Sequence, residues 1–178
     1  MEKVKVLCRY QRFFLILAVL FFAFFARQGH AGSNISHEDR KRLSELVAEE
    51  FLSVKEDLNF IEKNKNAAWA EGDRGFYDFW LKGLEKEREG NIADAIALYE
   101  KALETERYEM STYEVLLSLG RAYFLTGEKD KALSALQEFI KNAEQDLSEP
   151  GPWGFTPEGE QIMRKNIVHA RWLITLCK

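Results

Sequence analysis

Proline is almost absent from this sequence. The chain has 178 residues and only three prolines, all of them between positions 150 and 157. A proline inside a helix removes a hydrogen bond and clashes with the preceding turn, so helices can run unbroken through the long segment before residue 150. Strand signals are lacking too, because apolar residues recur every three or four positions instead of alternating with polar ones. We therefore expect an all-helical fold.

Residues suited to metal binding and catalysis are also scarce. The chain has two cysteines and three histidines, and His169 has no cysteine, histidine or aspartate at ligand spacing. We find no glycine-rich phosphate loop and no nucleophile motif. The acidic pairs Glu85/Glu87 and Glu104/Glu106 lie two residues apart, on different faces of a helix, and we expect them to be solvated. The sequence predicts no catalytic residue, no metal site, no cofactor and no enzymatic activity.

The first 31 residues have the pattern of a signal peptide. Basic residues precede an uncharged apolar run at positions 13–26, and Gly29 and Ala31 then supply the small residues that signal peptidase requires. The apolar run would reach only about two thirds of a roughly 30 Å hydrocarbon core. We expect cleavage near Ala31 and export to the periplasm or the medium. The alternative is an uncleaved anchor, with the domain facing the periplasm and membrane contact only through residues 13–26.

Cleavage would leave an acidic domain at residues 32–178. Its net charge would be −8, against −4 for the whole chain. We see no basic stripe for nucleic acid and no basic amphipathic helix for anionic lipid, so the sequence predicts neither partner. Cys177 would be the last cysteine, which excludes an internal disulfide. We expect it to be buried beside Leu173 and Leu176, the alternative being self-association through a bond between two chains.

An amphipathic helix is expected after Ser36, which has the side chain of a helix N-cap. Its apolar residues recur every three or four positions: Leu43, Val47, Phe51, Val54, Leu58 and Ile61. A second capping pattern at Ser53 leaves open a break into two helices. We expect a turn at Gly72 and Asp73 after it. A further helix is expected at 157–176, with Thr156 as its cap and Pro157 in its first position.

Between these helices the sequence repeats itself. Gly83 aligns with Gly120 and Gly90 with Gly127, each at an offset of 37 residues, and Ala95 and Ala102 align with Ala132 and Phe139 in the same way. The first glycine of each unit allows two helices to approach closely, and the second supplies the permissive backbone of a tight turn. The repetition predicts two helical hairpins, at about 75–107 and 111–145.

This pattern resembles the tetratricopeptide repeat, a helical hairpin of about 34 residues that occurs in stacked arrays. The second hairpin matches at Leu116, Leu119, Gly120, Tyr123, Gly127, Ala132 and Leu136, and the first at Phe79, Gly83, Gly90, Ala95, Tyr99 and Ala102. The first departs at Lys82, Lys86 and Arg107, and the second at Phe139. Two hairpins bury too little surface alone, so we expect the flanking helices to cover them within one domain. The last helix is also interpreted as half of a degenerate third repeat, with Ala170 at its small position.

The resemblance implies a concave groove that holds a protein or peptide. Residues expected to line it are Tyr77, Trp80, Leu84, Glu87 and Arg88 in the first hairpin, and Glu114, Leu117, Arg121, Phe124 and Leu125 in the second. Arg88 and Arg121 are expected to pair with a carboxylate. An alternative is that Trp80 packs beneath the N-terminal helix. The lysine and asparagine with which some members bind a C-terminal carboxylate are absent.

Two functions remain open at this point. The leading hypothesis is an exported adaptor or scaffold for a protein partner, in envelope assembly or secretion. The other is a carrier of a small apolar ligand in a helical-repeat pocket. Trp153 and Phe155, in a segment rich in proline and glycine, either pack over the core or contact a partner.

Overall fold

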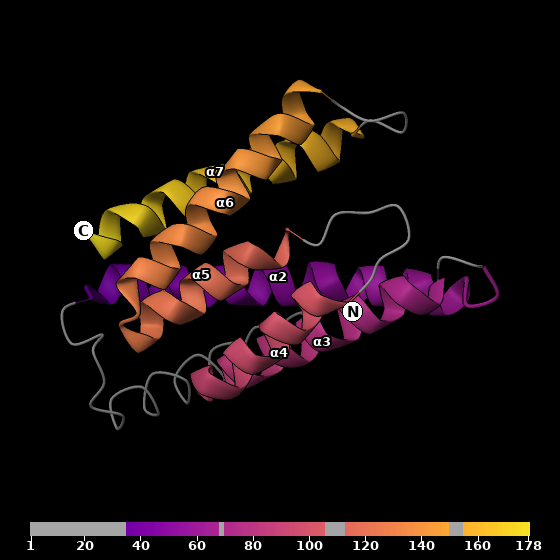
Figure 1. Ribbon diagram of the computed structural model, residues 1–178, viewed down its shortest axis with the longest axis horizontal. Helices are drawn as coiled ribbons and strands as arrows, with labels where there is room; N and C mark the ends of the chain where they lie inside the picture. Colours follow the sequence, from indigo (N-terminus) through magenta and orange to yellow (C-terminus); the bar gives the residue numbers. More distant parts are fainter. Residues whose placement is uncertain (1–34, 68–69, 106–112, 150–154) are drawn as a thin grey trace, which may run out of the picture.

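A computed structural model describes residues 35–67, 70–105, 113–149 and 155–178, and all regular structure in these ranges is helical (Figure 1). The predicted all-helical fold is confirmed. The helices are α2 (His37–Lys63), α3 (Ala70–Arg88), α4 (Ile92–Glu104), α5 (Val115–Thr126), α6 (Lys129–Ser148) and α7 (Pro157–Cys177). The predicted signal peptide, Arg107 and Trp153 lie outside the described residues.

Helix α2 is one unbroken helix. The backbone N–H of Asp39 donates to the Ser36 side chain at 3.0 Å, as expected for an N-cap, and the helix continues through Ser53 without the break that we had left open. At its end the Asn64 side-chain amide donates to the Phe60 carbonyl at 2.8 Å. The same carbonyl also accepts the backbone N–H of Asn64 at 3.2 Å, so Asn64 closes the helix with both its side chain and its backbone.

The predicted turn at Gly72 and Asp73 is wrong, because α3 already begins at Ala70. The chain turns earlier: the N–H of Ala67 donates to the Asn64 carbonyl at 2.9 Å, and the N–H of Ala70 donates to the Ala67 carbonyl at 3.1 Å. Asp73 lies in the first turn of α3 and is only 4% exposed. A carboxylate at this position is favoured by the helix dipole, which competes with the turn preference of the same residue.

Two helical hairpins follow, α3 with α4 and α5 with α6. Gly90 lies in the turn between α3 and α4, and Gly127 lies in the turn between α5 and α6. Their φ angles are 82° and 83°, the left-handed conformation that favours glycine. A Cβ atom at Gly120 would lie 2.6 Å from Leu136 Cγ, and one at Gly83 would overlap the ring of Tyr99. The predicted roles of all four glycines are confirmed: two form turns, and two allow the helices of a hairpin to pack closely.

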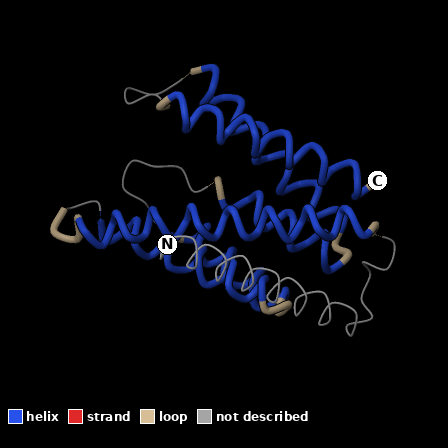
Figure 2. Tube along the Cα trace, turned by 180° about the vertical axis from the view of Figure 1, so that it is seen from behind, coloured by secondary structure: helices blue, strands red, loops and turns tan. Residues whose placement is uncertain are grey.

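The helices form a stack, with α2 lying across one side of it. Helix α5 packs against both α3 and α7, so α7 occupies the place that the first helix of a third hairpin would take. Figure 1 shows α2 behind α5, between the α3–α4 pair and the α6–α7 pair, and Figure 2 shows the same arrangement from behind. The core runs through all six described helices. Cys177 is buried in it, as expected.

Candidate functional site

The side of the stack that faces α2 is built around one buried arginine. Arg121 of α5 is 1% exposed, and its Nε and Nη2 atoms donate to the two carboxylate oxygens of Glu87 on α3 at 2.7 and 2.9 Å. Glu87 is completely buried. This two-point contact joins the first helices of the two hairpins with the planar geometry that favours arginine over lysine.

The third nitrogen of the guanidinium, Nη1, is directed at α2. Arg121 Nη1 donates to Glu50 Oε2 at 2.7 Å. The other oxygen of Glu50 accepts from Trp80 Nε1 at 3.2 Å and from the Ser118 hydroxyl. Ser118 in turn accepts a hydrogen bond from Trp80 Nε1 at 2.9 Å. Three donors from α3 and α5 therefore converge on one carboxylate of α2.

The electrostatics of this cluster keep Arg121 charged. Burial by itself would lower the pKa of Arg121, but the carboxylates of Glu50 and Glu87 raise it above its ordinary value. Tyr99 of α4 donates to Glu87 Oε2 at 2.7 Å, and burial together with the Glu87 charge raises its pKa. Two carboxylates surround one guanidinium, which leaves one negative charge without a matching cation. The Glu50 side chain is 14% exposed, so solvent can reach this charge.

Further contacts along α2 hold it to the stack. The Arg88 guanidinium lies 4.4 Å from the centre of the Phe51 ring, and Arg74 pairs with Glu62 at 2.8 Å. On α7, Lys165 pairs with Glu49 at 2.5 Å. The Trp172 ring of α7 lies 4.2 Å from Arg42 of α2. Helix α2 thus touches α3, α5 and α7, the helices that form the inner side of the stack.

The structure places the expected groove residues on this inner side, but most of them are covered. Tyr77, Trp80, Leu84, Leu117, Arg121 and Phe124 are buried, whereas Arg88 and Glu114 are partly exposed. The alternative interpretation of Trp80 holds, because its indole N–H bonds to Glu50 of α2. The carboxylates expected for Arg121 are present, but they come from the chain itself. Binding of a partner by these residues stays a prediction.

The expectation for Glu87 is wrong, since its side chain is buried and not solvated. Glu85 is exposed, as its spacing predicted. Glu87 follows Leu84 by three residues and therefore lies on the buried face of α3. Glu50 was missed altogether, although it lies three residues after Val47 and four before Val54, within the apolar face of α2. An acidic residue in an apolar stripe is the signal that identifies such a position.

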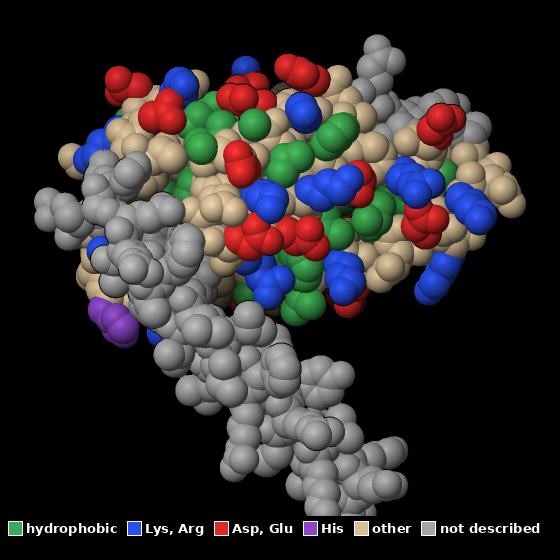
Figure 3. Space-filling model, turned by 90° about the horizontal axis from the view of Figure 1, so that it is seen from below, with side chains coloured by type: hydrophobic (Ala, Val, Ile, Leu, Met, Phe, Trp, Pro, Cys, Tyr) green, Lys and Arg blue, Asp and Glu red, His purple; other side chains and the backbone are tan. Residues whose placement is uncertain are grey.

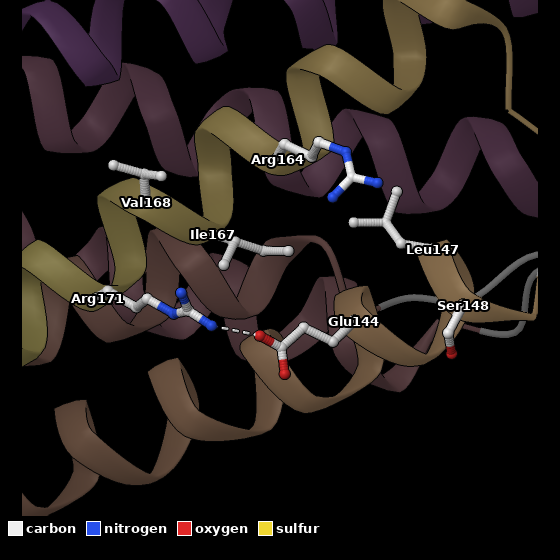
Figure 4. A pocket seen from close by; sticks show the side chains of 7 residues that line it. All are labelled: Glu144, Leu147, Ser148, Arg164, Ile167, Val168 and Arg171. Carbon is white, nitrogen blue, oxygen red and sulfur yellow. Dashed lines mark hydrogen bonds and ion pairs between the residues drawn. The ribbon is translucent and has the colours of Figure 1, made fainter.

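A separate cleft of about 410 Å³ lies between α6 and α7. Figure 4 shows its lining, with Arg171 bonded to Glu144 across the two helices. Leu147, Ile167 and Val168 supply its apolar side chains, and Val168 is 57% exposed. The cleft is open to solvent and has charged side chains beside the apolar ones, so the small-ligand carrier stays a prediction.

The outer surface carries no strong charge of one sign on the face seen in Figure 3, where acidic and basic side chains alternate around hydrophobic ones. Among the described residues, no cluster of three histidine, cysteine or acidic side chains is arranged to hold a metal ion. None of the described helices is both long enough and apolar enough to span a membrane.

One comparison with known proteins gives a match. Residues 114–145, which include α5 and most of α6, match the family model described as tetratricopeptide repeat. No curated protein and no solved structure matches the chain.

Proposed function

We propose that this chain, which contains a tetratricopeptide repeat at residues 114–145, is an adaptor that binds a helical segment of a protein partner on the inner side of its helical stack. Tetratricopeptide repeats are protein–protein interaction modules and are generally not enzymes. The observation that supports the site is that α3, α5 and α7 already hold a helix there, through Trp80, Arg121 and Lys165.

Photo-crosslinking tests where the partner binds. A photoreactive residue at Arg88, which is partly exposed beside α2, is compared with one at Val168, which is exposed in the α6–α7 cleft. We expect the variant with the photoreactive residue at position 88 to crosslink the partner and the variant with it at position 168 to give no crosslinked partner. A partner that crosslinks only from Val168 would move the binding surface to the α6–α7 cleft.

We further propose that the adaptor is exported and acts in envelope assembly or secretion. The support is the sequence of residues 1–31, where a basic segment, a 14-residue apolar run and small residues near Ala31 follow one another. N-terminal sequencing of protein recovered from the periplasm or medium is expected to begin at Gly32. A mature protein that starts before Gln28 would contradict cleavage and favour the anchored alternative.

A further inference from the structure

The carboxylate of Glu50 occupies a pocket made entirely by the two hairpins. Its donors are Trp80 Nε1 on α3 and the Ser118 hydroxyl and Arg121 Nη1 on α5. Arg121 Nε and Nη2 already donate to Glu87 of α3. The third nitrogen, Nη1, is the one that donates to α2. The pocket would therefore present a guanidinium N–H, an indole N–H and a hydroxyl to any helix that took the place of α2.

In the contacts between α2 and the stack, the stack mainly supplies positive side chains and α2 mainly supplies negative ones. The stack contributes Arg74 and Arg88 from α3, Arg121 from α5 and Lys165 from α7. Helix α2 contributes the carboxylates of Glu49, Glu50 and Glu62 and the ring of Phe51, whereas the contact of Arg42 with Trp172 has the opposite sense. A helix that binds this side of the stack is thus selected for acidic residues.

We infer that the side formed by α3, α5 and α7 is a receptor for an acidic amphipathic helix, that α2 is its resident ligand, and that a partner supplies a helix of the same kind in exchange. This inference rests on the proposed function and specifies its ligand.

The sequence of α2 defines the pattern that the partner helix needs. Its buried apolar residues lie seven, four and three positions before Glu50 and four and eleven after it: Leu43, Leu46, Val47, Val54 and Ile61. This spacing places the apolar side chains and the carboxylate on one helix face. A partner must match both features, because apolar contact alone leaves Arg121 Nη1 without an acceptor and a carboxylate alone leaves the apolar face of the stack in water.

Peptide exchange into the full chain tests this inference. A protease site is inserted in the exposed turn at 64–66 and cut after folding, so that α2 stays bound without a covalent link to α3. A fluorescent peptide of residues 36–64 is then added and followed by anisotropy and native mass spectrometry. We expect saturable binding with release of the resident α2 fragment, while the remaining helices keep their circular dichroism signal.

Two neighbouring glutamates provide matched competitor peptides. Glu50→Gln removes the charge that enters the pocket, and we expect this peptide to compete at least about tenfold less well. Glu49→Gln removes the same charge from an exposed pair with Lys165, and we expect it to compete within about twofold of the native peptide. Equal competition by the two variants would overturn the inference, as would an α2 fragment that never exchanges or a stack that unfolds when α2 leaves.

The result can be separated from that of the crosslinking experiment. If the peptide fails to exchange while a partner still crosslinks from Arg88, the adaptor function stands and the exchange of α2 does not. If the peptide exchanges and no partner crosslinks from Arg88, the receptor exists and the proposed adaptor function fails.

Discussion

Arg121 and Glu87 form a two-point ion pair, with N–O distances of 2.7 and 2.9 Å, in which both side chains are at most 1% exposed. The pair connects α5 to α3 and is continued by Glu50 to α2. Removing one partner of such a pair leaves an uncompensated charge inside the protein, which is far more costly than the pair itself is stabilising.

Replacing Arg121 with methionine is expected to lower the free energy of unfolding by about 3–5 kcal/mol, because Glu87 and Glu50 then lose their cation. Urea unfolding followed by circular dichroism measures the change. Arg171→Met is the matched control: Arg171 pairs with Glu144 on the surface, and the expected loss is below about 1 kcal/mol. A similar small loss for both variants would show that the buried cluster is not needed for stability.

Replacing Gly120 with alanine should destabilise the second hairpin by about 1–3 kcal/mol, since the new methyl group would lie 2.6 Å from Leu136 Cγ. Thermal unfolding gives the difference. Gly159→Ala is the control, because its Cβ would lie 3.4 Å from Thr156 Oγ1, an ordinary van der Waals distance. A Gly120→Ala protein as stable as the Gly159→Ala protein would contradict the close approach of α5 and α6.

His169 is expected to make stability fall in mild acid. Burial, followed by the charges of Arg42 and Lys165, lowers the pKa of His169, while Glu49 opposes this and Arg121 adds to it. Its Nδ1 atom has no hydrogen-bond partner among the described residues. A histidine whose pKa is lower in the folded state stabilises the fold above its unfolded pKa of about 6.5, and this contribution is lost as the pH falls through the folded pKa.

The measurement is urea unfolding at pH 7.5 and at steps down to pH 5. His169→Gln should flatten the decrease in stability below pH 6.5. An unaltered pH profile in the His169→Gln protein would exclude this histidine as the cause.

Cys177 is expected to react slowly with thiol reagents in the folded protein. It is 4% exposed, and burial raises the pKa of its thiol, so both access and the thiolate fraction are reduced. We expect reaction with a disulfide reagent to be much faster in urea than in buffer. Rapid reaction of the folded chain would favour the alternative in which Cys177 joins two copies.

The hairpins could be predicted because glycine destabilises a helix interior, so its recurrence at helical positions indicates close packing. Gly83 and Gly120 recur at one spacing and each meets a large side chain of the following helix, Tyr99 and Leu136. Local sequence therefore contained both the turn and the close packing. The turn before α3 was misplaced because Gly72 and Asp73 favour turns in isolation, whereas in the folded chain Asp73 lies at a helix start.

The site was less predictable, because it depends on which helix covers the inner side. The positions of Trp80 and Arg121 followed from the repeat pattern, but the identity of their partner did not. Glu50 lies 71 residues from Arg121, and no local rule connects the two. Glu87 was misassigned because its spacing from Glu85 shows only that the two carboxylates lie on different faces, whereas its spacing from Leu84 places it on the face that α4 and α5 bury.

The position of α2 also has a consequence for the order of folding. Each hairpin closes through contacts between neighbouring segments, whereas Glu49 of α2 meets Lys165 over a separation of 116 residues. Helix α2 also packs extensively against α3, its neighbour in the chain, so this local contact can form early, whereas the ion pair with α7 requires a long loop to close. In a chain synthesised from its N-terminus, α2 could pair with α3 early, and its contact with α7 would be the last of its contacts to form.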